Sequence, residues 1–311
     1  MPDSGTVVLS IDAELIWGFH DLEEMPMERV ECARESWLAV LDLFETYDVP
    51  ATWAVVGHLL LEGCAGTHSQ HPAGEDWFAR DPGGSYSPGS YWFGQDLVDA
   101  VLDSEIDHEI GSHSFSHVEF GRSSTTAEIA DAELRYSRET AANYGLDPTS
   151  FVFPRNNIGH RSLLAEHGFR CYRGTTPDRW YDRTPFRRAG KFVDWGIGAS
   201  APPLVSPAVD DHGLVNIPAS LYLFDFEGPP RAAVETVFDN PVIRQVERGL
   251  ERLEHEQEGI FHLWFHPNNI TTRQDHDRMN TIIALIADYR DRHGIQIETM
   301  AQVSERVLDG G

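Results

Sequence analysis

A pair of histidines, His113 and His117, is the feature of the sequence with the clearest chemical potential. Side chains four residues apart lie one helical turn apart, so both imidazoles could point at one metal ion, and imidazole suits zinc and other divalent metals. The apolar residues just before the pair predict a short strand over 106–111, which would place it where a strand ends in a loop. The H-E-x-x-H pattern of zinc proteases is excluded, because three residues separate Glu109 from His113. Two surface histidines on a polar turn are the alternative in a chain with 15 histidines.

Two carboxylates follow the first predicted strand, residues 7–11, at positions Asp12 and Glu14. Residues two apart on an extended chain point the same way, so both carboxylates face one side. One carboxylate and two imidazoles make a three-ligand site with an open position for water, as in catalytic zinc sites, and the second carboxylate is then free to act as a base. The alternative is a solvated strand end in a very acidic protein.

Two further strands end in residues that could take part in catalysis. The aromatic strand 261–265 runs into His266 and Pro267, and the short strand 151–153 runs into Pro154 and Arg155. Proline removes a backbone donor and stops a strand, which fixes His266 at the strand end. A lone histidine or arginine at such a position serves structure as readily as catalysis.

Taken in order, these four pieces resemble the motifs of the polysaccharide deacetylases of the NodB-homology type, carbohydrate esterase family four. The corresponding segments are residues 10–14, 113–117, 153–156 and 264–267, and the resemblance spans residues 6–300. The first motif departs from the common pattern of two adjacent aspartates, because Ala13 separates Asp12 from Glu14. This sequence resembles a branch of the family with a D-x-E first motif.

The resemblance implies a division of roles among these residues. It implies a divalent metal, zinc by preference, held by Glu14, His113 and His117. It also implies catalytic residues: a base, an arginine paired with that base, and a general acid, which are Asp12, Arg155 and His266. Such a site would hydrolyse the N-acetyl group of an amino sugar in a polysaccharide, a lipid-linked glycan or a nucleotide-linked sugar. Substrate-binding candidates near the motifs are Trp17, Trp92, Asn156 and Trp264, and Asp194 is a candidate for orienting the catalytic histidine.

Two rival functions stay open on the sequence alone. One is a metal-independent hydrolase of the same fold that cleaves another C–N bond, such as that of a cyclic amide. The other is a catalytically silent carbohydrate-binding protein in which Ala13 marks the loss of metal. The intact histidine pair argues against the first, and the retention of Asp12, Arg155 and His266 beside the ligands argues against the second.

The order of predicted elements indicates an α/β fold. Strands alternate with helices predicted over 28–47, 125–144, from 241 onward and over 275–292, and such alternation produces a parallel sheet. Together with the resemblance, this predicts a distorted seven- or eight-stranded (β/α) barrel that forms a single domain over residues 1–311. The segment 63–94 is rich in glycine, proline, serine and aromatic residues, which predicts a loop insertion. Its aromatic residues either overhang the site and contact substrate or anchor the loop to the barrel.

Composition restricts the setting. The net charge is −26 and Lys191 is the only lysine, which favours a salt-adapted, haloarchaeal protein whose surface repulsion is screened at high salt. Such acidity argues against nucleic-acid binding. The chain shows no leader-like segment and no apolar run of membrane-spanning length, so we expect a cytoplasmic protein. The cysteines, none in an evident metal-binding spacing, are expected to be buried free thiols: Cys32, Cys64 and Cys171. The sequence leaves the oligomeric state open.

Overall fold

The computed structural model describes residues 5–197, 200–226, 228, 231, 234–235 and 240–310. Its strands are β1 (Thr6–Ala13), β2 (Thr52–Val55), β3 (Gly63–Cys64), β4 (Gly84–Ser85), β5 (Glu109–Ser112), β6 (Ser150–Phe151), β7 (Cys171–Gly174), β8 (Ala208–Val209), β9 (Val215–Pro218), β10 (Leu221–Tyr222), β11 (Ile260–Phe265) and β12 (Gln296–Glu298).

The α-helices are α1 (Met27–Tyr47), α2 (Gln95–Leu102), α3 (Ala127–Asn143), α4 (Arg161–Glu166), α5 (Arg187–Ile197), α7 (Pro241–Glu256), α8 (Arg273–His293) and α9 (Met300–Leu308). Four short 3₁₀ helices follow strand ends or lie near them: η1 (Leu15–Gly18), η2 (Gly57–Leu60), η3 (Pro154–Asn156) and η4 (Pro267–Asn269). The predicted helices over 28–47, 125–144 and 275–292 correspond to α1, α3 and α8.

A curled half-barrel sheet forms the centre of the molecule, with strand order β10-β11-β1-β2-β5-β6-β7-β9-β8 and with β12 also paired to β1. Neighbouring strands are parallel except β8 and β9, which are antiparallel. The α/β barrel prediction is therefore confirmed. The sheet has ten strands rather than the seven or eight expected, because short segments such as β8 and β10 were not distinguishable from loops.

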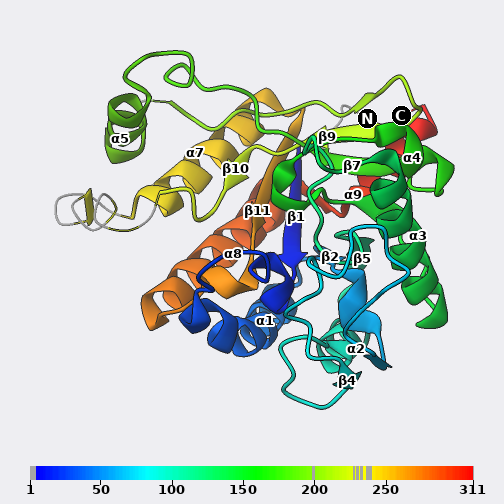
Figure 1. Ribbon diagram of the computed structural model, residues 1–311. Helices are drawn as coiled ribbons and strands as arrows, with labels where there is room; N and C mark the ends of the chain where they lie inside the picture. The colour runs from blue at the N-terminus through cyan, green and yellow to red at the C-terminus, as the bar shows by residue number, and fades with distance from the viewer. Residues whose placement is uncertain are drawn as a thin grey trace.

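The central strand β1 is buried along its whole length. This is expected for a strand in the middle of a parallel sheet, because such strands are buried on both faces. Figure 1 shows α1, α7 and α8 along one side of the strands and α3 and α4 along the other. The indole rings of Trp37 on α1 and Trp53 on β2 stack with centroids 5.2 Å apart and tie helix to sheet. In the parallel register Ala13 lies opposite Val55 and Val55 opposite Ser112, so β1, β2 and β5 end at one edge of the sheet.

Candidate active site

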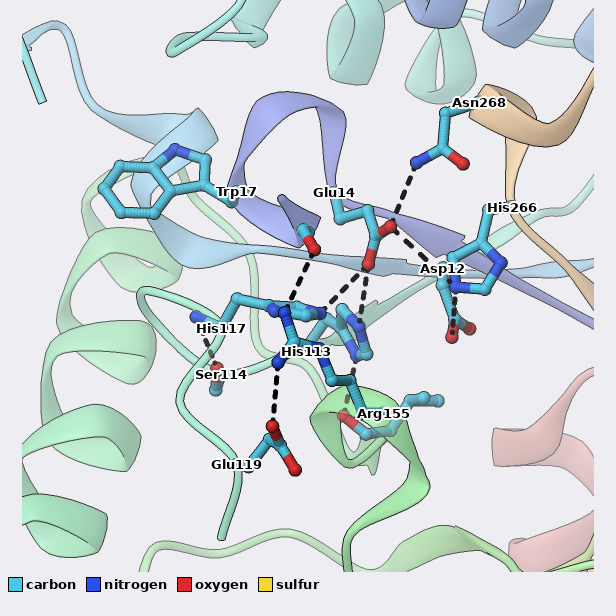
Figure 2. A network of polar contacts seen from close by, with 12 residues as sticks. Asp12, Glu14, Trp17, His113, Ser114, His117, Glu119, Arg155, His266 and Asn268 are labelled. Carbon is cyan, nitrogen blue, oxygen red and sulfur yellow. Dashed lines mark hydrogen bonds and ion pairs between the residues drawn. The ribbon is translucent and has the colours of Figure 1, made fainter. Parts of the chain in front are cut away.

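Polar side chains from the ends of three strands meet at the carboxyl edge of the sheet. Asp12 lies in β1, with Glu14 just after it, and the two histidines follow β5. His266 follows β11, which is hydrogen-bonded to β1 with Ile11 opposite Phe265. Because the carboxyl ends of parallel neighbours coincide, residues far apart in sequence converge here, as at the catalytic face of other α/β barrels. Figure 2 shows these side chains pointing toward one another.

Glu14, His113 and His117 form a compact, buried group with ligand atoms close enough to bind one ion. The Glu14 Oε2 atom lies 3.0 Å from His117 Nε2 and 3.6 Å from His113 Nε2. His113 Nδ1 donates to the carbonyl oxygen of Val152 over 2.8 Å, so the unprotonated Nε2 is the atom that faces the carboxylate. Within the described residues that buried nitrogen has no hydrogen-bond partner. An unpaired imidazole nitrogen beside a carboxylate is a donor set that fits a divalent metal.

The histidine pair reaches this arrangement without the helical turn that the spacing suggested. Residues 113–117 form a loop after β5, and both Ser114 and His117 have positive φ, 63° and 66°. The carboxylate of Glu133 on α3 accepts hydrogen bonds from the backbone N–H groups of Phe115 and Ser116 at 2.9 and 2.8 Å. This buried carboxylate therefore stabilises the turn that brings the two imidazoles together.

Glu14 is positioned by residues that the sequence interpretation missed. Asn268 in η4 donates from Nδ2 to Glu14 Oε1 over 2.9 Å, which leaves Oε2 to face the imidazoles. A Cβ atom on Gly18 would lie 2.2 Å from Glu14 Oε1, so only glycine leaves room for the carboxylate. Burial raises the pKa of Glu14, but the neighbouring His266, His113 and His117 outweigh it and hold this pKa well below its usual value. The only sequence signal for Asn268 was its place just after the His266-Pro267 motif.

The partner of Asp12 is Arg173, which corrects the prediction that Arg155 fills this role. Arg173 lies on β7, is fully buried, and donates from Nη1 and Nη2 to the two Asp12 oxygens at 2.6 and 2.7 Å. It also bonds the Oγ atom of Ser10 and the Oδ1 atom of Asn156. Burial raises the pKa of Asp12, but Arg173 outweighs it, so this pKa is lowered.

Arg155 sits instead on the outer side of the site, in η3, with positive φ of 52°. Its guanidinium pairs with Asp21 and with Glu119, the latter at 2.8 Å. The physical reason for the error is this left-handed turn after Pro154, which directs the side chain away from Asp12. Arg173 lies within β7, whose four residues are all buried, and the sequence offers no signal that separates it from an arginine on a solvated strand face.

His266 is oriented by Asn269 and Tyr222, not by Asp194. Its Nδ1 atom lies 3.0 Å from Asn269 Oδ1 and 3.3 Å from the Tyr222 hydroxyl. Its Nε2 atom points into the site, 3.5 Å from Asp12 Oδ2. The prediction for Asp194 is wrong, because this buried carboxylate accepts from Arg179 at 2.7 Å and from Trp180 and Ser200, and no described contact joins it to His266.

The four candidate substrate-binding residues differ in what they offer. Trp17 is fully buried and stacks against His58 and the edge of Trp92, so its indole presents no face to a ligand and that prediction is wrong. Trp92 is partly buried, and its carbonyl oxygen accepts from the Trp17 indole. Asn156 is a partner of Arg173. Trp264 lines a cavity of about 500 Å³ that Tyr222, a neighbour of His266, also lines.

Comparison with known proteins agrees with this architecture. Residues 21–172 match the polysaccharide deacetylase family model, a range that includes both histidines but neither Asp12 nor His266. No curated protein matches the chain.

Among solved structures, a Mycobacterium smegmatis protein assigned to the polysaccharide deacetylases shares 16% identity, with a TM-score of 0.62 and coverage of 99% of this chain and 92% of that one. A Pseudomonas aeruginosa PAO1 protein with the same assignment shares 14% identity, with a TM-score of 0.58 and coverage of 99% and 92%. The allantoinase Puue shares 12% identity, with a TM-score of 0.59 and coverage of 98% and 91%. Residues 21–172 thus match the model of the polysaccharide deacetylase family, and over nearly its whole length the chain shares the fold of these solved structures.

Proposed function

We propose that this protein is a metal-dependent deacetylase that removes the N-acetyl group from an amino sugar. The observation that supports this best is the buried Glu14–His113–His117 group next to an ionised Asp12 and a directed His266. Three ligands with an open fourth position are typical of catalytic zinc sites. A divalent metal bound there, with zinc the best match to the ligand set, would activate a water molecule and polarise the acetyl oxygen.

The surrounding residues supply the proton transfers. Asp12 is held ionised by Arg173, so it can accept a proton from the attacking water. The amine of an amide leaves poorly unless it is protonated, and His266 can donate that proton because Asn269 aims its Nε2 atom into the site. The products are acetate and a free amino group.

The cavity beside His266 is the best candidate for the sugar-binding region. Tyr222 and Trp264 stack with ring centroids 4.1 Å apart and line it, and aromatic surfaces of this kind pack against the apolar face of a sugar ring. Cations also line it, among them Lys191. The proposal includes a polysaccharide, a lipid-linked glycan or a nucleotide-linked sugar as substrate. No described helix is long and apolar enough to cross a bilayer.

Acetate release from a panel of these N-acetylated sugars tests the proposal, in molar salt, with and without chelator and after zinc is restored. Release that chelator removes and zinc restores supports it. Metal content gives an independent measurement: Glu14→Gln should lower zinc binding at this site, whereas Asp12→Asn should bind zinc normally and lose activity. Activity that survives chelation, with no metal bound at Glu14, would contradict the proposal.

Such a result would favour the metal-independent C–N hydrolase, since Puue allantoinase shares the fold. The same panel therefore includes a cyclic amide. A protein that binds sugar, releases no acetate and is unaffected by Asp12→Asn would instead be a carbohydrate-binding protein.

We also propose that the enzyme works at high salt concentration. The chain has 24 Lys and Arg residues against 50 Asp and Glu residues, and the self-repulsion that this excess produces is screened more strongly as the ionic strength rises.

A further inference from the structure

A second group of potential metal ligands lies outside the candidate active site. It consists of His58 in η2, Cys64 in β3, and His68 and Asp81 from the insertion 63–94, and their ligand atoms all lie within 4.8 Å of one another. Three of these side chains approach a single oxygen, Asp81 Oδ2: His68 Nε2 at 2.9 Å, His58 Nε2 at 3.1 Å and Cys64 Sγ at 3.2 Å.

The group has the shape of a tetrahedral site. Zinc–ligand distances of about 2.0–2.3 Å imply that neighbouring ligand atoms lie about 3.3–3.8 Å apart at the corners of a tetrahedron. The two imidazole Nε2 atoms are 3.2 Å apart, close to that edge length. Hydrogen bonding to Asp81 alone would place both N–H groups against each other at this distance, which is unfavourable. A shared metal ion removes that conflict, because both nitrogens then present lone pairs.

Two of the four ligands, His58 and Asp81, are also oriented from behind, as metal ligands usually are. His58 Nδ1 lies 3.2 Å from the carbonyl oxygen of Trp92, which favours a proton on that nitrogen and a lone pair on Nε2. The second Asp81 oxygen, Oδ1, accepts from the backbone N–H of Gly83 over 2.9 Å. The side chains of His58 and Asp81 are fully buried, and that of His68 is 14% exposed.

Two glycines allow the chain segments to meet around this group. Gly66 and Gly83 both have positive φ, 79° and 64°. A Cβ atom on Gly66 would lie 2.8 Å from the carbonyl oxygen of Asp81, and one on Gly83 would lie 2.9 Å from the carbonyl carbon of Ala65. Glycine at these two positions therefore allows the backbone segments that carry Cys64 and Asp81 to lie close together.

We propose that His58, Cys64, His68 and Asp81 bind a structural zinc ion that fastens the insertion 63–94 to the barrel. Four protein ligands with one thiolate leave no open position, which is typical of structural rather than catalytic zinc. The expectation that no cysteine has a metal-binding spacing is thus replaced for Cys64, which stands four residues before His68, as His113 stands before His117.

The proposed zinc would act on the candidate active site through packing. Trp17, in the segment that follows Glu14, stacks on His58 with centroids 4.3 Å apart. Trp77 from the insertion donates its indole N–H to Ser116 Oγ over 2.9 Å, within the histidine loop. Release of the ion should therefore loosen the insertion first and the histidine loop second.

Metal analysis of the purified full chain tests the proposal directly. The wild type should hold two zinc ions per chain, and the double variant His113→Gln/His117→Gln should hold one. Adding Cys64→Ser or His68→Gln to that background should remove the remaining ion. Cys32→Ser is the matched control, since Cys32 is also a free, partly buried thiol but lies outside the group, and it should change nothing.

Cobalt substitution supplies a measurement whose first result, on the wild type, does not depend on the folding of any variant. The cobalt-loaded wild type should show the near-ultraviolet charge-transfer band of a thiolate ligand, Cys32→Ser should retain it, and Cys64→Ser should lose it. Absence of the band in the wild type, or a metal-free His113→Gln/His117→Gln protein, would overturn the proposal. Because these readouts do not involve acetate release, they remain decisive if the proposed deacetylase activity fails.

Discussion

Replacing Arg173 with glutamine tests the assignment of the Asp12 partner most directly. Arg173 makes five hydrogen bonds, two of them to Asp12, and is fully buried. Removal of one member of a buried ion pair leaves an uncompensated charge and costs about 3–5 kcal/mol. With an unfolding entropy of about 2.1 cal/mol/K per residue and 311 residues, Tm should fall by about 5–8 °C.

The pH dependence of activity should change in a defined direction. In the wild type, Arg173 lowers the pKa of Asp12 against the effect of burial, so the base is ionised down to acidic pH. Without Arg173 burial dominates, the pKa rises, and the acid limb of kcat/KM should move to higher pH. The stability that this pair contributes is present above the unfolded-state pKa of Asp12 and is lost as pH falls through the folded-state value.

Arg155→Gln is the matched control, since it removes the guanidinium first expected to pair with Asp12. Arg155 is 29% exposed and pairs with Asp21 and Glu119, so its loss should cost about 1 kcal/mol or less, or about 2 °C. The acid limb should stay where it is. If Arg155→Gln moved the acid limb and Arg173→Gln did not, the assignment of Arg173 would be refuted.

Three further predictions concern the histidine, the second carboxylate and the surface. Asn269→Ala should lower kcat by about tenfold or more with little change in KM, because His266 loses the acceptor that directs it. This loss is part of the full contribution of acid–base catalysis, which is about 10²–10⁴-fold. An unchanged kcat would show that Asn269 does not orient His266. Asp194→Asn should lower stability by about 3–5 kcal/mol through its partner Arg179, measured by denaturant unfolding, and a shifted pH–rate profile would show that it acts on the site after all. The Tm should rise between 0.1 and 2 M KCl, since a net charge of −26 is screened as the Debye length falls from about 10 Å to about 3 Å or less; a flat curve would contradict salt adaptation.

The strand ends of the site could be predicted from sequence because each combines a short apolar run with an abrupt polar residue. β1 is such a case, since Val7 to Ile11 is uninterrupted and Asp12 closes it. Parallel pairing then brings the ends together whatever the loop lengths are. This is why the positions of Glu14, His113 and His266 were predictable.

The partners of those residues could not be predicted, because they depend on loop conformation. Arg155 follows its strand as expected, but a left-handed turn directs it to Asp21. Arg173 lies inside a strand, where a charged residue between apolar ones usually indicates a solvated face. The group that includes Cys64 is assembled from segments of irregular spacing, and only the fold shows that they meet.

The electrostatics of the fold support the proposal that Glu14, rather than Asp12, binds the metal. Asp12 has its own counterion in Arg173, at 2.6 Å. Glu14 has no guanidinium partner among the described residues: it accepts from the neutral amide of Asn268 and faces imidazoles, of which His117 has its pKa lowered by burial. A buried carboxylate needs a compensating cation. A divalent ion at Glu14 supplies that charge and engages the unpaired His113 nitrogen, whereas at Asp12 it would have to compete with a bidentate guanidinium. We therefore infer that the ion binds at Glu14 and that Asp12 is the base.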